Sequence, residues 1–240
     1  MKIPFVREWG SWAVFVSSVL AALIAGLTTG PWETGKNFSR VTLPALLGLT
    51  MLINSKNPLA SVLRTRGRNR EHLLWFLFFS LSGLFLLVPF LIDGLRDFSI
   101  FAVLVMIYGI LLYRGKEHSL LAELNGFALL TVSAPVVYYT VTGVLSLKLY
   151  AAVLLFFGAG VFKVRVRIRK TVKYRWIMVI YCAIAAFLYS VLEISVIILM
   201  PLIENVVSVI AMRDEKLRTT GNIELIKGII FIILIGFFWR

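Results

Sequence analysis

The sequence predicts an all-α fold, a polytopic bundle of about nine transmembrane helices in a single domain. Three observations lead to this prediction. Hydrophobic residues make up 60% of the chain and charged residues 15%, with a mean hydropathy of +0.91, so a water-soluble domain would lack the polar residues to cover its surface. Apolar runs long enough to cross a bilayer recur along the chain. Finally, the cations gather in the short connections between these runs.

The apolar runs define the predicted spans. A helix rises about 1.5 Å per residue, so about 20 residues cross about 30 Å of hydrocarbon, and somewhat fewer suffice when polar ends reach outward. The runs lie at residues 11–30, 39–54, 72–92, 98–113, 119–142, 146–162, 174–190, 192–212 and 222–239. The first run lacks an obvious small-residue cleavage site, so we expect a retained helix rather than a removed signal peptide.

The stretch from 174 to 212 needs a separate argument because it is too long for one span. Its length suits a tight helical hairpin, which we place near Ser190. The distribution of cations supports this division. Without it, the cations between residues 213 and 221 would move to the cation-poor side of the membrane.

Alternate connections between the spans differ in their number of Lys and Arg residues, and this difference predicts the orientation of the chain in the membrane. With nine spans, one side holds 19 of the 25 cations and the other side holds five, while Lys227 lies within the last span. The cation-rich side holds Lys2, Arg7, Lys56, Arg64, Arg66, Arg68, Arg70, Arg114, Lys116, Lys163, Arg165, Arg167, Arg169, Lys170, Lys173, Arg175, Arg213, Lys216 and Arg218. The rule that positive loops stay inside therefore predicts a cytoplasmic N-terminus and an outside C-terminus, in the cell membrane.

The sequence KVRVRIRKTVKYR at residues 163–175 places a cation at nearly every second position. Such alternation is typical of a half-exposed strand, but the apolar runs on both sides favour a cytoplasmic loop between the sixth and seventh helices. We favour contact between this loop and anionic phospholipid headgroups, at about 1 kcal/mol per basic residue. A phosphate site is the alternative, formed with the second cluster, RTRGRNR at 64–70, because Arg holds phosphate with paired donors.

Several classes of site are disfavoured. The formal charge of +13 is spread over short loops between apolar runs, so it indicates membrane contact rather than nucleic acid. The only histidines, His72 and His118, lie at loop edges, and the single cysteine, Cys182, lies in an apolar run. We therefore predict no metal site, and the sequence identifies no cofactor, no catalytic residue and no oligomeric state.

Charged side chains inside the predicted spans are candidates for function, because charges in lipid are costly and usually face a bundle interior. Glu204 and Asn205 lie in the eighth span and are the strongest candidates. Glu224 and Lys227 are spaced i, i+3 in the ninth span and pair with each other, or Lys227 reaches Glu204 if the last two helices are neighbours. Glu123 and Asn125 begin the fifth span as a cap or as part of a pocket.

Further candidate ligand-binding residues lie at the cytoplasmic ends of the spans. Glu8, Trp9 and Trp12 precede or begin the first span, where tryptophans commonly anchor the interface. Asn54 and Asn57 follow the second span and either bind a ligand or end the helix before Pro58. The remaining candidates are the arginines of the two basic clusters: Arg64, Arg66, Arg68, Arg165 and Arg167.

Three stretches resemble the YwiC-like family of bacterial and archaeal membrane proteins. REWGSWAVF at 7–15 is similar to the opening His-Gly-Ala-Trp signature of the family, with Trp9 and Ser11 replacing the histidine and the alanine. FKVRVRIRKTVKYR at 162–175 is similar to its basic loop after the sixth helix. MPLIENVVSV and LRTTGNIELIKGIIF are similar to its last two helices, with Gly221 and Glu224 as the Gly-x-x-Glu element and Glu204 where the family tends to carry arginine.

The YwiC-like resemblance implies topology rather than a reaction, because the family has no established activity. Nine helices with an inside N-terminus also resemble the UbiA-type prenyltransferases, which hold Mg²⁺ and an isoprenoid diphosphate with aspartate-rich loops. The corresponding loops of this chain, NSKNPLASVLRTRGRNR and KVRVRIRKTVK, contain no carboxylate. Magnesium-dependent prenyl transfer is therefore disfavoured, whereas direct binding of a diphosphate or lipid headgroup by the cations stays open.

Three functions remain open, and the sequence does not decide between an enzyme and a transporter. The favoured one is binding of an anionic lipid or isoprenoid-phosphate headgroup at the cytoplasmic face. The second is transport of a small solute or ion along a path lined by Glu204, Glu123 and Lys227. The third is a non-enzymatic membrane protein that binds a partner.

Overall fold

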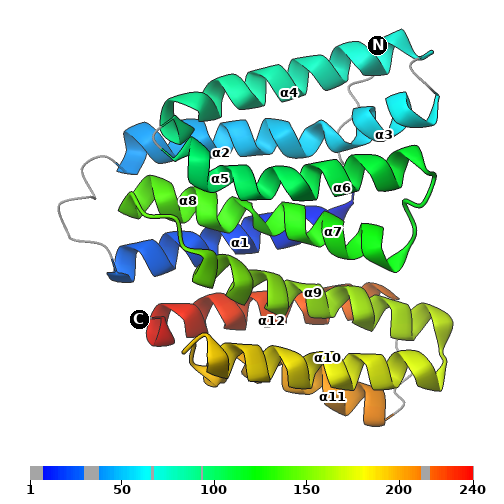
Figure 1. Ribbon diagram of the computed structural model, residues 1–240. Coiled ribbons are helices and arrows are strands. Elements are labelled where there is room, and N and C mark those ends of the chain that lie inside the picture. Colours follow the sequence, from blue (N-terminus) through cyan, green and yellow to red (C-terminus); the bar gives the residue numbers. More distant parts are fainter. Residues whose placement is uncertain (1–7, 30–37, 66–67, 93, 212–216, 240) are drawn as a thin grey trace.

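A computed structural model describes residues 8–29, 38–65, 68–92, 94–211 and 217–239 of the 240-residue chain. Every regular element in this part of the chain is helical (Figure 1). In order, the elements are α1 (Trp9–Thr29), α2 (Phe38–Asn54), α3 (Lys56–Arg64), α4 (Arg70–Leu91), α5 (Leu95–Phe98), the 3₁₀ helix η2 (Ser99–Phe101), α6 (Ala102–Tyr113), α7 (Leu120–Thr131), α8 (Ser133–Thr142), α9 (Leu147–Arg169), α10 (Val172–Val191), the 3₁₀ helix η3 (Val196–Leu202), α11 (Ile203–Ile210) and α12 (Leu217–Phe238).

The described elements form nine passages along the bundle when consecutive segments are joined. Helix α3 continues α2, α6 continues α5 and η2, α8 continues α7, and α11 continues η3. Seven passages in the described part of the chain are long and apolar enough to cross a membrane, and the exceptions are α2 and the shorter apolar stretch Val196–Ile210. The prediction of a polytopic bundle of about nine helices is confirmed.

The predicted hairpin near Ser190 is also confirmed. Helix α10 ends at Val191, and Glu193 then adopts a left-handed backbone conformation with a φ of 55°. The backbone N–H of Ile194 donates a hydrogen bond of 2.8 Å to the carbonyl oxygen of Tyr189, which closes the end of the helix. The chain then returns as η3, in which Pro201 lacks the N–H that an α-helical hydrogen bond would need.

The basic stretch at 163–175 differs from the prediction. Residues 163–169 form the last turns of α9 instead of a loop, and the turn to α10 begins at Lys170, whose φ is 48°. The helix continues because its buried side follows helical spacing, from Leu149 through Ala152, Phe156 and Ala159 to Lys163. The cations of this stretch therefore project from a helix in several directions rather than along one loop.

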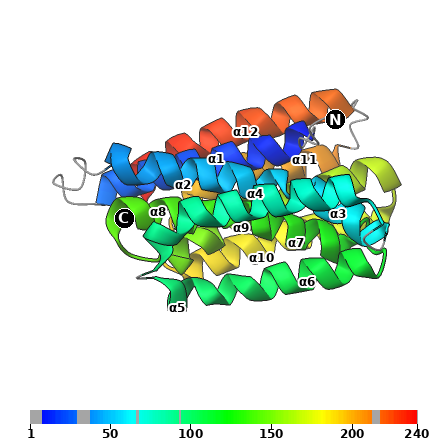
Figure 2. The ribbon, with the colours of Figure 1, turned by 90° about the horizontal axis from the view of Figure 1, so that it is seen from above.

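Helices α1 and α9 and the α7–α8 passage form the centre of the bundle. The share of buried residues in the spanning segment is 56% for α9 and 50% for both α1 and the α7–α8 passage, but only 11% for the segment containing α6. Helices α6 and α12 lie at opposite edges of the bundle in Figure 2, and α4 and α10 lie at opposite edges in Figure 1. The peripheral helices expose apolar side chains, as expected for surfaces that face lipid.

Close helix contacts depend on small residues and on tyrosine hydroxyls. Where α2 crosses α4, a Cβ added to Gly48 would lie 2.9 Å from the carbonyl oxygen of Gly83, and a Cβ added to Gly83 would lie 2.9 Å from that of Gly48. Helix α10 is bound to α9 by the hydroxyl of Tyr189, which donates a hydrogen bond of 2.8 Å to the carbonyl oxygen of Ala152. The Tyr189 hydrogen bond holds α10 against α9, which carries part of the candidate site.

Candidate functional site: a charged cluster between three helices

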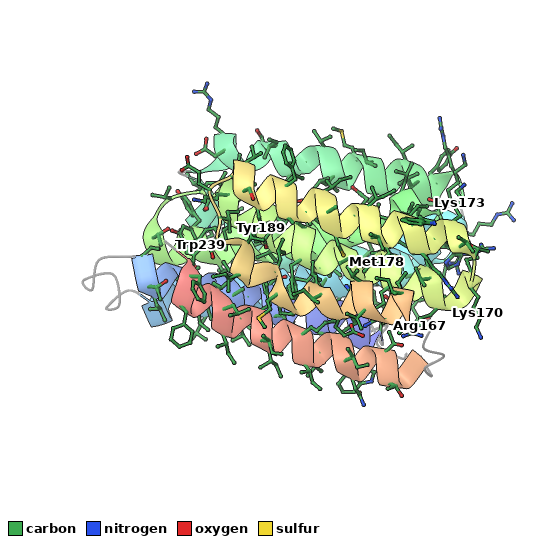
Figure 3. The ribbon with its side chains drawn as sticks, turned by 90° about the horizontal axis from the view of Figure 1, so that it is seen from below. Arg167, Lys170, Lys173, Met178, Tyr189 and Trp239 are labelled. Atoms are coloured by element: carbon green, nitrogen blue, oxygen red, sulfur yellow. The ribbon has the colours of Figure 1, made fainter. Side chains whose placement is uncertain are left out.

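Most described charged side chains lie at one end of the bundle, where α1 and α12 begin and α9 ends. Figure 3 shows Arg167, Lys170 and Lys173 at this end, and Tyr189 and Trp239 toward the other end. We call the first the charged end. Whether it faces the cytoplasm stays a prediction.

The centre of the candidate site is a cluster of four charged residues, Lys163 of α9, Glu204 of α11, and Glu224 and Lys227 of α12. We call it the four-charge cluster. Lys163 contacts Glu204, and its Nζ lies 3.1 Å from Glu224 Oε1. Lys227 contacts Glu224, and its Nζ lies 3.2 Å from Glu204 Oε2. Each ammonium group therefore lies between two carboxylates and each carboxylate between two ammonium groups, and the formal charges sum to zero.

Only the two glutamates of the cluster have partly exposed side chains. The Lys163 and Lys227 side chains are 1% and 5% exposed, whereas those of Glu204 and Glu224 are 33% and 29% exposed. Lys163, Glu204 and Glu224 lie about two helical turns, or about 10 Å, from the charged end of their helices, and Lys227 lies about one turn deeper. Charges at such a depth are tolerated because they neutralise one another.

Asn205 completes the cluster from α11. Its side chain is fully buried, and its Oδ1 accepts a hydrogen bond from the Lys227 ammonium. Its Nδ2 is buried as well and has no hydrogen-bond partner among the described residues. An unsatisfied buried donor is costly, so this amide is a polar group of the site that packing alone does not explain.

The sequence prediction for this cluster was partly right. Glu204, Asn205, Glu224 and Lys227 are brought together, with both of the pairings that the sequence left open for Lys227. Lys163 was assigned to a loop instead. Its position four residues after Ala159, on the stripe of buried residues in α9, is the signal that would have identified it.

A second group of ion pairs joins the two basic clusters to one segment. Arg165 Nε donates to Glu123 Oε2 at 2.7 Å, and another Arg165 nitrogen donates to the carbonyl oxygen of His118 at 3.0 Å. From the other cluster, Arg64 donates to both oxygens of Glu117 at 2.8 and 2.9 Å. The two clusters thus converge on residues 117–123, where their arginines are bound to protein groups.

The remaining candidates near the charged end make contacts within the bundle. Lys56 Nζ lies 2.9 Å from Glu8 Oε2, and the hydroxyl of Ser11 donates to the same oxygen at 2.9 Å. Burial raises the pKa of the Glu8 carboxyl, but the hydrogen bond and charge of Lys56 and the hydrogen bond of Ser11 outweigh it and leave the pKa below its usual value. Trp9 is 89% exposed, as an interfacial anchor would be.

Trp12 packs edge-to-face on Phe15, with ring centroids 5.9 Å apart. Among the amides, Asn54 Nδ2 donates to the carbonyl oxygen of Thr50 in its own helix at 2.9 Å, and Asn125 Nδ2 donates to that of Leu104 in α6 at 2.9 Å. Asn57 lies in α3, Arg68 is exposed just before α4, and Arg167 lies in the last turn of α9. Arg66 lies outside the described residues.

Two hollows are found elsewhere on the described surface. One of about 510 Å³ lies at the opposite end, beside Asp97, Tyr139 and Gly143. The other, of about 400 Å³, is an apolar groove between α10 and the η3–α11 passage that includes Cys182 and Met200. Neither is lined by a residue of the four-charge cluster.

Comparison with known proteins identifies the family. The sequence model of the YwiC-like protein family matches residues 5–138. The chain belongs to the YwiC-like family. In this YwiC-like protein, the matched residues run from before α1 into α8, so the four-charge cluster on α9, α11 and α12 lies beyond them. No curated protein and no solved structure matches the chain.

Proposed function

We propose that this multi-pass YwiC-like membrane protein binds anionic headgroups, of phospholipids or isoprenoid phosphates, at its charged end. We further propose that this end faces the cytoplasm of the cell membrane. The supporting observation is a surplus of exposed cations at this end after the described ion pairs are formed.

The surplus follows from the pairing of most carboxylates at this end. Glu8, Glu117, Glu123, Glu204 and Glu224 each lie against at least one Lys or Arg, and Glu71 in the first turn of α4 is a further, exposed carboxylate. The exposed cations outside these pairs include Arg68, Arg70, Arg114, Lys116, Arg169 and Lys173. Basic residues near an anionic membrane surface contribute about 1 kcal/mol each, so a group of this size supports retention of anionic lipid.

The turn between α9 and α10 is the strongest part of this surface. Arg169 ends α9 and Lys173 lies in the first turn of α10, so both exposed residues flank the turn at the charged end, where Figure 3 shows Lys173. Arg offers several donors in a planar fork and Lys offers a compact charge, and both bind phosphate groups.

The test is lipid retention. The full chain is extracted in mild detergent, incubated with phosphatidylglycerol, undecaprenyl phosphate or phosphatidylcholine, and analysed by native mass spectrometry. We expect both anionic lipids to be retained over phosphatidylcholine, and the Arg169→Gln, Lys173→Gln double variant to lose much of this preference. The matched control is Arg96→Gln, an exposed arginine at the opposite end. Equal retention of all three lipids by the unaltered protein would refute the proposal.

A second candidate, transport of a small ionic solute, is supported by the four-charge cluster. Ionisable residues on separate spanning helices are common along the substrate paths of transporters. Its test is electrogenic uptake by proteoliposomes, screened over small ions. A current that Glu204→Gln abolishes would support transport, and a current unchanged by this substitution would remove the reason for proposing it.

A further inference from the structure

The four-charge cluster has a feature that headgroup binding does not use. Its four ion pairs involve one oxygen of each carboxylate only, Oε2 of Glu204 and Oε1 of Glu224. Both carboxylates are about one-third exposed, whereas both ammonium groups are buried. The acidic groups of the cluster therefore lie on its open side and the basic groups on its closed side.

Protonation of Glu204 would affect its two partners differently. Lys227 would keep Glu224 and the Oδ1 of Asn205 as acceptors. Lys163 would keep only one charged partner in the described chain, Glu224 at 3.1 Å, because protonated Glu204 could accept a hydrogen bond but would carry no charge. A buried ammonium group that loses the charge of one of its two carboxylates becomes much less stable in its buried position. We therefore expect protonation of Glu204 to weaken mainly the contact between α9 and α11.

Helix α11 is suited to respond to such a change. It has eight residues, follows the 3₁₀ segment that contains Pro201, and packs mainly on α10. Its polar links to the other two helices of the cluster are the contacts of Glu204 with Lys163 and Lys227 and the contact of Asn205 with Lys227. Loss of the Glu204 charge would therefore remove the charged attachment of α11 to α9, whereas Asn205 would still attach α11 to Lys227 of α12.

We propose that the four-charge cluster is a proton-binding site in which a proton on Glu204 releases Lys163 and loosens helix α11 from helix α9. The titratable groups around Glu204 in the described chain are Lys163 from α9, Glu224 and Lys227 from α12, and Cys182 from α10, which interacts electrostatically with Lys227 and Glu224. The neighbouring Tyr181 donates its hydroxyl to the carbonyl oxygen of Leu155 in α9 at 2.9 Å. Carboxyl groups are the class of side chain that takes up protons in the acidic range, so acid acts on Glu204 rather than on the ammonium groups or the thiol.

The test is hydrogen–deuterium exchange of α11 in the full chain, reconstituted in phosphatidylcholine nanodiscs and measured from about pH 7 to about pH 3, because two neighbouring ammonium groups favour the charged carboxylate. After correction for the intrinsic rate at each pH, we expect exchange in residues 203–210 to rise by about tenfold or more as the pH falls. Glu204→Gln should show the raised exchange at neutral pH and no further pH dependence. Glu123→Gln, which breaks the nearby pair with Arg165, should keep the pH dependence of the unaltered protein.

Two further variants keep the test decisive. If Glu204→Gln does not fold, the electrically balanced variant Lys163→Met, Glu204→Gln replaces it and should also be independent of pH. Glu224→Gln distinguishes the two carboxyls and should leave a pH response in α11. The proposal is overturned if exchange in α11 of the unaltered protein does not depend on pH, if a variant lacking the Glu204 carboxyl keeps the response, or if only Glu224→Gln abolishes it.

Discussion

The ammonium nitrogen of Lys227 lies 3.2 Å from Glu204 Oε2, which links α12 to α11, while Lys163 links the same carboxylate to α9. Three passages that are separate in sequence are thus joined through one oxygen atom. The free energy of such an arrangement depends on its charge balance, because an unpaired charge in a bundle interior is far more costly than a neutral polar group.

The charge balance gives the first prediction. Lys163→Met leaves two carboxylates with one ammonium group, and we expect it to lower the free energy of unfolding by about 3–5 kcal/mol. The double variant Lys163→Met, Glu204→Gln is neutral again and should recover much of the loss. Unfolding in detergent, followed by circular dichroism, measures both effects.

The control for the cluster is Glu117→Gln. This carboxylate pairs with Arg64, whose side chain is 67% exposed, so we expect a loss below about 1 kcal/mol. Simple addition of the two single losses in the Lys163 and Glu204 double variant would contradict the charge-balance argument, because residues in one ion-pair network should not act independently.

The crossing of α2 and α4 gives the second prediction. In Gly48→Ala, the added methyl group would meet the Gly83 carbonyl oxygen at 2.9 Å and Leu87 Cγ at 2.9 Å, so the helices must separate. We expect a loss of about 1–3 kcal/mol in the free energy of unfolding. Gly109→Ala on α6 is the matched control, because an added Cβ there meets nothing within 4 Å, and its helix should gain up to about 1 kcal/mol. Equal effects of the two substitutions would count against the close packing of α2 on α4.

The Glu8 and Lys56 pair gives the third prediction. The pKa of Glu8 is lowered in the folded protein, so the unfolded chain binds more protons than the folded chain in the acidic range. The stabilisation by this pair is therefore complete above the ordinary pKa of a glutamate and is lost as the pH falls through the lower, folded value. We expect the difference in unfolding free energy between the unaltered protein and Glu8→Gln to shrink from about pH 7 to about pH 3. If this difference in unfolding free energy instead grew as the pH fell, the folded protein would have a raised pKa at Glu8, which would contradict the prediction.

The direction of the chain gives the fourth prediction. Helix α1 begins at the charged end and α12 ends at the opposite one (Figure 1). We expect a reporter fused before residue 1 to be active in the cytoplasm and one fused after residue 240 to be active outside. Paired alkaline phosphatase and fluorescent protein fusions measure this directly. Reporters located in the same compartment would contradict an odd number of crossings.

The passages were predictable because hydropathy and helix length are local properties of the sequence. The reversal after Ser190 was predictable for a similar reason. The apolar stretch was too long for one span, and only a reversal places the cations beyond it on the cation-rich side of the membrane. The pairing of Glu204 with Lys227 was predicted only on condition that α11 and α12 are neighbours.

Lys163 was missed because its surroundings in sequence, a cation at every second position, resemble a solvated loop. Lys163 is buried because other helices cover α9 about two turns before the end of that helix. The sequence around Lys163 does not show which helices do so. The same limit applies to Glu123 and Glu117, whose partners Arg165 and Arg64 come from distant helices.

The η3–α11 passage has a consequence for the surrounding bilayer. Its seven 3₁₀ residues and eight α-helical residues span about 26 Å, because a 3₁₀ helix rises about 2.0 Å per residue and an α-helix about 1.5 Å. An average hydrocarbon layer is about 30 Å thick, so lipids beside this passage must shorten or tilt their chains. The protein should therefore partition into thinner regions of a membrane, with the deformation confined to the edge formed by α10 and α11.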